Sequence, residues 1–312
     1  MQVHYGTARI ETPRPVVTIG SFDGVHLGHI SVIKALNARA RAFGGESVII
    51  TFEPHPREVL YPDEPKPGIL TTLPEKRAVL EACGVDHLVV LNFTPAFARL
   101  SYEDFVRQVL VERIGVRGLV MGYDHHFGYE RAGNFERLQE LSRRYGFFLE
   151  REAVFEADSE NVSSTKIRQA LAEGNVACVT RFLGRPYSFT GKVVAGSQLG
   201  RQLGFPTANL VVDDARKLLP ARGVYAVRVC LADGRVLGGM LNVGTRPTVA
   251  SDESELTLEV HLFDFSGDLY GSMLSVHLVA HLRAEQPFPS LSSLQVQLQQ
   301  DQLAALRELT KE

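Results

Sequence analysis

The pattern of apolar residues changes once along this chain, near residue 185, and the change limits the folds that are open to it. Before it, short continuous apolar segments alternate with segments of helical spacing. After it, strand-like segments follow one another with Gly, Pro and Asp between them. Alternating strands and helices predict an α/β domain with a parallel sheet covered on both faces, whereas successive strands predict an antiparallel sandwich or barrel.

The elements expected before the change are strands and helices in alternation. The strands are expected at 16–20, 47–52, 87–91, 118–121 and 147–150, and the helices at 30–43, 74–83, 102–113, 134–145, 164–174 and 176–183. Beyond it we expect strands at 189–195, 224–231, 236–243, 256–263 and 274–280, with a terminal helix at 291–309. We place the domain boundary near residue 185, which gives domains of 1–184 and 185–312.

Composition limits the partners of these two domains. The chain has 312 residues, and 33 basic against 36 acidic residues give a net charge of −3, without the basic surplus of a nucleic-acid binder. The three cysteines lie far apart and form no CxxC metal or redox motif. Residues 1–15 contain no apolar segment of the kind found in leaders, and no apolar segment approaches membrane length, so we expect neither a leader nor a membrane span. We therefore expect a cytoplasmic protein with small-molecule partners, no nucleic acid and no membrane, as a monomer or weak homo-oligomer.

The segment Gly20 to His29, which reads G-S-F-D-G-V-H-L-G-H, follows the first expected strand and precedes a helix. Helix starts at the carboxyl end of a parallel sheet suit phosphate, and glycines let the backbone approach a bulky anion. His26 and His29 lie three residues apart, so both can face one phosphate. Taken alone, an HxGH sequence could equally be two surface histidines in a turn, and a zinc site is disfavoured because no HExxH pattern is present.

Three further polar segments follow expected strands or open a helix in the same half of the chain. They are T-F-E-P-H-P at 51–56, G-Y-D-H-H-F-G at 122–128 and S-S-T-K-I-R at 163–168. The carboxyl ends of parallel strands meet at one edge of a sheet, so these turns are expected near the HxGH loop. Alone, the Ser-Ser-Thr sequence would be no more than a helix cap.

A second candidate site lies at 191–209, where Gly196, Gly200 and Gly204 precede the sequence F-P-T-A-N. Thr207 and Asn209 point to one side of an extended chain, and neutral oxygens combined with substrate phosphates suit Mg²⁺. In the expected strand 256–263, Glu259 shares a face with His261 and could accept a proton from a hydroxyl. The alternatives are a glycine-rich hairpin and a solvent-facing carboxylate.

The first 185 residues resemble the FMN adenylyltransferase module of bacterial bifunctional riboflavin kinase/FAD synthetases, on the four segments quoted above. The resemblance implies a Rossmann-like nucleotidylyltransferase domain with a parallel sheet. It also implies that His26 and His29 stabilise the α-phosphate transition state and the pyrophosphate. The same resemblance implies that Arg168, counted with these histidines among the catalytic residues, grips the β- and γ-phosphates together with Ser164 and Thr165. The ATP-binding positions implied are Gly20, Phe22, Gly24, Gly28, Ser164 and Thr165, and the flavin-binding positions are Asp124 and Phe127.

Two positions in this half depart from the pattern of that family. His125 stands where Phe is usual, which could alter an aromatic wall of the flavin pocket. Lys166 stands where Arg is frequent, which keeps the charge but loses the bidentate fork.

The second half resembles the riboflavin kinase module of the same family over nearly its whole length. The matching segments are G-F-P-T-A-N, G-V-Y-A-V, L-N-V-G-T-R-P-T, L-E-V-H-L-F-D-F and D-L-Y-G. The resemblance implies a small antiparallel β-barrel with a terminal helix, ATP at Gly196, Gly200, Gly204 and Thr207, Mg²⁺ at Thr207 and Asn209, Glu259 as catalytic base and Arg283 as a flavin contact. Ala195 departs from the His that many relatives carry.

Together these features predict an enzyme that phosphorylates riboflavin to FMN with ATP and adenylylates FMN to FAD with a second ATP. One alternative is a single-activity enzyme: a riboflavin kinase with a decayed first domain, which His125 keeps open, or an adenylyltransferase for another phosphate substrate. A non-catalytic flavin carrier would not need Glu259, Thr207 or the two histidines. An aminoacyl-tRNA synthetase would need a basic surface and an anticodon-binding extension.

Overall fold

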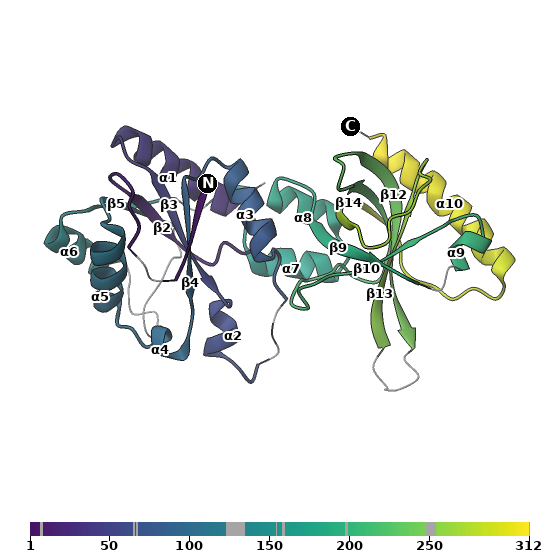
Figure 1. Cartoon of the computed structure of the whole chain (residues 1–312), viewed down its shortest axis with the longest axis horizontal. Helices are drawn as coiled ribbons and strands as arrows, with labels where there is room; N and C mark the ends of the chain where they lie inside the picture. Colours follow the sequence, from purple (N-terminus) through teal and green to yellow (C-terminus); the bar gives the residue numbers. More distant parts are fainter. Residues whose placement is uncertain are drawn as a thin grey trace. The chain divides into compact units, whose positions relative to one another are not determined.

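The computed structural model describes residues 1–6, 9–64, 66, 68–122, 135–153, 155–157, 160–196, 199–247 and 254–311 (Figure 1). The chain forms two compact units, Met1–Ser163 and Ser164–Glu312. Each unit has its own six-stranded sheet, and these two sheets differ in kind. Among the described residues, no helix is both long enough and apolar enough to span a membrane.

The first unit is built on a six-stranded sheet in which every neighbouring pair is parallel, as the strand–helix alternation predicts. In spatial order the strands are β1 (Gln2–Tyr5), β4 (His87–Asn92), β3 (Ser47–Glu53), β2 (Val16–Ile19), β5 (Gly118–Met121) and β6 (Phe148–Arg151). The edge strand β1 is an addition to the expected set. A small hairpin of β7 (Glu156–Ala157) and β8 (Glu160–Asn161) follows the sheet.

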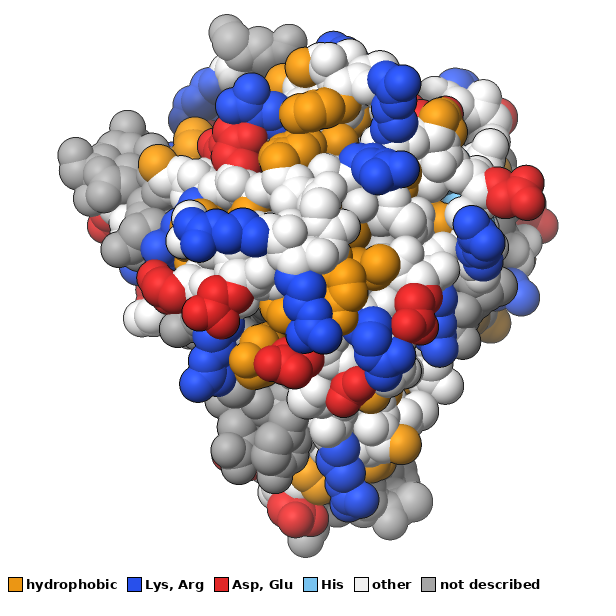
Figure 2. Space-filling view, turned by 90° about the vertical axis from the view of Figure 1, so that its left-hand side faces the viewer, with side chains coloured by type: hydrophobic (Ala, Val, Ile, Leu, Met, Phe, Trp, Pro, Cys, Tyr) orange, Lys and Arg blue, Asp and Glu red, His pale blue; other side chains and the backbone are white. Residues whose placement is uncertain are grey.

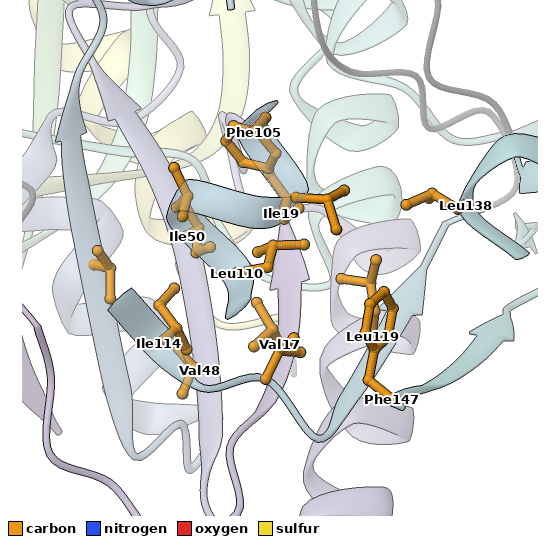
Figure 3. Close-up of a cluster of buried hydrophobic side chains, with 14 of the residues drawn as sticks. Val17, Ile19, Val48, Ile50, Phe105, Leu110, Ile114, Leu119, Leu138 and Phe147 are labelled. Carbon is orange, nitrogen blue, oxygen red and sulfur yellow. The ribbon is translucent and has the colours of Figure 1, made fainter. Parts of the chain in front are cut away.

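Helices cover both faces of this sheet, and successive strand residues alternate between two buried cores. Val17 and Ile19 face one core, which includes side chains of α5 (Tyr102–Phe105), η1 (Val106–Ile114) and α6 (Phe135–Tyr145) (Figure 3). Val16 and Ile49 face the other core, with α1 (Leu27–Ala42) and α3 (Leu73–Ala82). Burial on both faces explains why these strands read as continuous apolar segments. Two short helices, α2 (Pro56–Leu60) and α4 (Pro95–Ala98), complete the described helices of this unit.

The single helix expected over 102–113 differs in the structure. A four-residue α-helix, α5, continues as the nine-residue π-helix η1, which ends at Gly115 in a left-handed conformation with φ of 70°. The buried residues Val106, Leu110 and Ile114 recur every four positions. That spacing suits both kinds of helix, so apolar periodicity alone does not separate them.

Charged side chains of both signs lie side by side on the face shown in Figure 2, and they do not gather into a patch of one sign. Ion pairs such as Arg107 Nη2 to Asp104 Oδ1, at 2.8 Å, are solvent-exposed. Exposed pairs of this kind contribute little to stability.

The second unit is a closed six-stranded antiparallel barrel, which decides between the sandwich and the barrel that the strand pattern allows. Around the barrel the strands run β10 (Ala208–Val211), β13 (Ser254–Leu262), β12 (Val236–Pro247), β11 (Gly223–Cys230), β14 (Met273–Arg283) and β9 (Ser188–Val194). The short helix α9 (Leu199–Gln202) lies between β9 and β10. The terminal helix α10 (Leu291–Leu309) has the bounds predicted from the sequence, and it packs on β11, β12 and β14.

Two helices at the start of this unit fall on the other side of the predicted boundary near residue 185. These are α7 (Ser164–Ala172) and α8 (Val176–Leu183). They belong to the second compact unit because α8 packs against β14 and the Ala221 N–H donates to the Leu171 carbonyl. The functional boundary at 184/185 stays a prediction.

Candidate functional sites

The loop from Gly20 to His26 connects the carboxyl end of β2 with the start of α1, where phosphate is expected in a parallel sheet. Phe22 and Val25 have φ values of 46° and 40°, which non-glycine residues rarely adopt. Buried polar contacts hold the strained loop. The Ser21 carbonyl accepts from Lys76 Nζ at 2.7 Å and from Thr51 Oγ1 at 3.1 Å. Strain held in this way is common at functional sites.

Asp23, at the centre of the HxGH-containing loop, is a structural carboxylate. Its side chain is 2% exposed and accepts hydrogen bonds from the backbone N–H groups of Leu70 and Thr71 at 2.9 and 3.1 Å. Gly24, with φ of 82°, donates its own N–H to Thr71 Oγ1. The loop is therefore fixed from its buried side by the segment that precedes α3.

His26 and His29 meet as the spacing predicts. Their rings stack with centroids 3.6 Å apart and planes 15° apart, and Phe22 packs against the His29 ring with centroids 5.0 Å apart. His26 is also the N-cap of α1, because its Nδ1 accepts from the His29 N–H at 3.3 Å. A nitrogen that accepts carries no proton, so the neutral His26 ring is protonated at Nε2. A Cβ on Gly28 would lie 3.2 Å from His26 Nδ1, so this position keeps room for the cap.

The other residues predicted for this site include three on α7 and Gly20, which begins the loop itself. Ser164, Thr165 and Arg168 all lie on α7, at the start of the second unit, and none of them is fully buried. Gly20 directly follows β2, and a Cβ there would lie 3.1 Å from the Phe22 ring. The flavin positions Asp124 and Phe127, with His125, lie outside the described residues.

In the second unit, the three glycines before F-P-T-A-N are needed for two reasons, the close approach of other atoms and a left-handed backbone. A Cβ on Gly196 would lie 2.1 Å from the Asn209 amide nitrogen, and a Cβ on Gly200 would lie 2.3 Å from the Phe205 carbonyl. Gly204 instead supplies a backbone φ of 83°. The glycines therefore permit a tightly folded segment immediately before Thr207.

Thr207 and Glu259 come together in a cavity of about 370 Å³ within this unit. Thr207 Oγ1 donates to Glu259 Oε2 at 3.3 Å. The barrel register places Asn209 opposite Glu259 on one side and Asn242 opposite it on the other. Directly paired residues of adjacent strands project from the same face of a sheet, so the three polar side chains form a row. The cavity is lined by Gly200, Leu203, Phe205, Thr207, Val224, Met240, Asn242, Glu259, His261, Arg283, Glu285, Gln286, Phe288, Leu294 and Leu298.

Arg283 also lines this cavity, and its guanidinium pairs with the terminal helix. Its Nε and Nη2 donate to the Asp301 carboxylate at 2.9 and 2.7 Å, and its Nη1 donates to the Ala284 carbonyl at 3.0 Å. Gln297 Nε2 also donates to Asp301, at 2.9 Å. Arg283 therefore links β14 to α10, while its predicted role as a flavin contact stays a prediction.

Sequence reasoning missed several residues that shape these sites. Asn242 carries no signal of its own within the segment L-N-V-G-T-R-P-T, and its place beside Glu259 follows from the barrel register. Asp301 looks like an ordinary polar position of an amphipathic helix, and Lys76 like an exposed helix lysine. Only an unusual depth of burial, 3% and 5% exposure, sets these two apart.

Two family models match successive parts of the chain. Residues 9–166 match the family model described as FAD synthetase, and residues 183–309 match the model described as riboflavin kinase. The bifunctional riboflavin kinase/FMN adenylyltransferase of Escherichia coli (strain K12) is 41% identical over 290 residues, which cover 93% of this chain and 91% of the relative. The chain belongs to this bifunctional family. It is a transferase with riboflavin kinase and FMN adenylyltransferase activities.

A second relative carries the same description, and a solved structure shares the fold. The bifunctional riboflavin kinase/FMN adenylyltransferase of Pseudomonas fluorescens is 43% identical over 290 residues, 93% of this chain and 91% of the relative. A solved structure described as a macrolide-efflux protein from Streptococcus pneumoniae superimposes with a TM-score of 0.89 at 30% identity, covering 98% of this chain and 99% of that one. The fold of the bifunctional enzyme is thus found along the full length of a solved chain.

Proposed function

We propose that the two activities are divided between the two units, with riboflavin phosphorylated in the barrel cavity and FMN adenylylated at the HxGH loop. The observation that carries the proposal is the pairing of Thr207 with Glu259 in a cavity that also contains Asn242. A carboxylate beside a hydroxyl and an amide can both accept a proton and orient a phosphoryl donor. Phosphoryl transfer depends mainly on such positioning and on charge stabilisation.

In the kinase step, Glu259 accepts the proton of the ribityl 5′-hydroxyl as its oxygen attacks the γ-phosphorus of ATP. Thr207 steers the Glu259 carboxylate because it donates to Oε2. Asn209 and Asn242 flank the same carboxylate from the neighbouring strands. Glu259 is half-buried, so it can meet substrate on one side and protein on the other.

The side chains around Glu259 fit Mg²⁺ in the company of nucleotide phosphates. Among the described residues, no cluster of three or more His, Cys, Asp or Glu could hold a metal ion. The donors here are instead the Thr207 hydroxyl and the Asn209 amide oxygen, a hard and mostly neutral set that suits Mg²⁺ when phosphates complete the ligands. When bound, Mg²⁺ would offset the phosphate charge of ATP.

In the adenylyl step, the FMN phosphate attacks the α-phosphorus of a second ATP and pyrophosphate leaves. The phosphate nucleophile is already ionised, so the step needs charge stabilisation more than a base. His26 can donate from Nε2 because its Nδ1 is engaged by the α1 backbone. The stacked His29 lies beside it and can act on the same phosphate. Gly24, Gly28 and the helix start supply close backbone approach.

The remaining parts of the proposal concern the setting of the enzyme. The substrates are riboflavin, FMN and ATP, with the adenylyltransferase module at 1–184 and the kinase module at 185–312. We place the protein in the cytoplasm, without nucleic-acid or membrane partners, as a monomer or weak homo-oligomer.

Two variants of the full chain test the division of labour. The assay supplies riboflavin or FMN with ATP and Mg²⁺ and separates FMN and FAD by chromatography. Glu259→Gln should lower FMN formation by roughly 10²–10⁴-fold, the usual share of a general base, and leave FMN-to-FAD conversion intact. His29→Ala should lower FAD formation from FMN by roughly 10²–10³-fold and leave the kinase step intact.

Matched controls carry the same chemical changes at a distance from the sites. The control for Glu259→Gln is Glu308→Gln, on α10, and the control for His29→Ala is His4→Ala, on β1. Both controls should retain both activities. Loss of both activities in a folded Glu259→Gln or His29→Ala protein would contradict the two-site assignment.

A further inference from the structure

His261 lies in the wall of the barrel cavity but has no part in the reaction steps above. It follows Glu259 by two residues on β13, so both side chains project from the same face of the strand. Both residues line the cavity together with Thr207. A histidine so close to the reacting carboxylate invites the question of whether it transfers protons or holds the site in place.

The contacts of His261 are those of a structural donor. Its Nδ1 lies 2.8 Å from the Pro206 carbonyl oxygen. A carbonyl can only accept, so Nδ1 carries a proton whether the ring is neutral or charged. The ring is further held edge-on by Phe205 and Phe263, with centroid distances of 5.3 and 5.8 Å and interplanar angles of 68° and 69°. These contacts fix both the position of the ring and the direction of its donor.

The carbonyl that accepts this hydrogen bond belongs to the residue just before Thr207. Pro206 immediately precedes Thr207, and the strand β10 begins only at Ala208. The peptide that joins Pro206 to Thr207 therefore lies outside the ladder that pairs β10 with its neighbours. His261 supplies a side-chain hydrogen bond to this peptide from the facing strand.

Two residues of one strand thus hold two successive residues of the F-P-T-A-N segment. His261 binds the Pro206 carbonyl, and Glu259 binds the Thr207 hydroxyl at 3.3 Å. The first contact sets the orientation of the peptide that carries Thr207. The hydrogen bond from Thr207 to Glu259 depends on that orientation of the peptide.

We propose that His261 is a positioning residue for the kinase step. By holding the Pro206 carbonyl, His261 presents Thr207 and Asn209 to the ATP phosphates. The proposal rests on the assignment of Thr207 and Asn209 to ATP and its cation. His261 touches neither the transferred phosphoryl group nor the hydroxyl in this scheme. Its effect is expected on ATP binding and on the alignment of Glu259.

Two variants of the full-length enzyme separate the donor from the ring. His261→Asn places an amide N–H near the position of Nδ1, whereas His261→Phe keeps an aromatic ring and loses the donor. The KM for ATP and kcat are measured for FMN formation, with FMN-to-FAD conversion as an internal control and thermal unfolding as a check of the fold. Loss of one hydrogen bond should raise the KM for ATP of His261→Phe by roughly three- to tenfold. His261→Asn should recover most of that loss.

The pH profile distinguishes positioning from proton transfer. Because Nδ1 keeps its proton in both charge states, kcat/KM of His261→Asn should follow the same pH profile as the parent enzyme. A lost or shifted limb in that variant would make His261 a catalytic acid or base and overturn the proposal. So would a His261→Phe enzyme with an unchanged KM for ATP, or equal defects in the two variants.

Failure of the proposal can be told from failure of the site assignment. Full kinase activity in a Glu259→Gln enzyme would contradict the assignment of the kinase site to this cavity. If His261→Phe keeps the parent KM for ATP while Glu259→Gln is inactive, only the positioning role of His261 is contradicted.

Discussion

Replacing Asp301 by Ala should destabilise the contact between β14 and the terminal helix strongly. The carboxylate is 4% exposed, and it accepts from Arg283 Nε and Nη2 and from Gln297 Nε2. Breaking a buried ion pair by removing one partner costs about 3–5 kcal/mol. The Arg283 side chain is 19% exposed beside the cavity, so water can recover part of its hydration. We expect a loss of roughly 2–4 kcal/mol, or a fall in Tm of about 5–15 °C.

Hydrogen exchange followed by mass spectrometry on the full chain gives the sharpest measurement. Peptides from Met273–Arg283 and Leu291–Leu309 should exchange faster in Asp301→Ala, while peptides from the first unit should not change. Thermal unfolding gives the accompanying Tm. Glu308→Ala is the matched control, since it removes an exposed ion pair of the same helix, with Lys311, and should change exchange little.

A double-mutant cycle with Arg283→Ala identifies the cause. Each single change leaves one charge without its partner, so the double variant should be less destabilised than the two single losses added, by roughly 1–3 kcal/mol. Additive losses, or unchanged exchange in Leu291–Leu309 of Asp301→Ala, would refute the reasoning from burial.

Three further predictions concern other parts of the chain. Gly28→Ala should lower FAD formation from FMN by roughly ten- to hundredfold and spare FMN formation, because its Cβ would crowd the His26 ring; chromatography of both reactions would show otherwise if the loop yields. The Thr12 hydroxyl and then His87 lower the pKa of Glu46, so this carboxylate stabilises the fold above its ordinary pKa and loses that effect as pH falls. Thr12→Val should raise the pH of acid unfolding followed by circular dichroism, and an unchanged midpoint would contradict this. Burial raises the pKa of Tyr225 to about 12. The neutral Tyr225 side chain therefore stabilises the fold fully below pH 10, and this stabilisation is lost toward pH 12. Tyr225→Phe should weaken that dependence in urea unfolding and cost about 1 kcal/mol at neutral pH, since the hydroxyl donates to the Ala221 carbonyl.

The elements that could be predicted from sequence are those whose residues carry their own signal. Buried strands such as β3 are continuous apolar segments, and α10 shows its apolar face and its Ser290 cap. The edge strand β1, with the sequence Q-V-H-Y, has mostly polar residues and acquires its conformation from pairing with β4. The strand β10 is four residues long and follows a proline, so no local pattern marks it.

The same distinction holds for the candidate sites. The HxGH loop, Thr207, Asn209 and Glu259 could be selected because their residue types and spacing suit phosphate chemistry. Asn242 could not, because its place depends on the register of β12 against β13. The link between Arg283 and Asp301 joins residues 18 positions apart through the docking of a helix. Such roles arise from packing and are invisible to local reasoning.

The capping of α1 by His26 has a consequence for how this enzyme can lose activity over evolutionary time. One imidazole performs two duties, since its Nδ1 caps the first turn of α1 and, in the proposed adenylyl step, its Nε2 donates to phosphate. Asn, Ser or Asp could replace the first duty without the second. A lineage that abandons FAD synthesis could therefore drift at this position and keep a well-folded first unit. Relatives that have lost FMN adenylyltransferase activity should carry Asn, Ser or Asp at the position of His26. Their stability would not differ from that of active relatives.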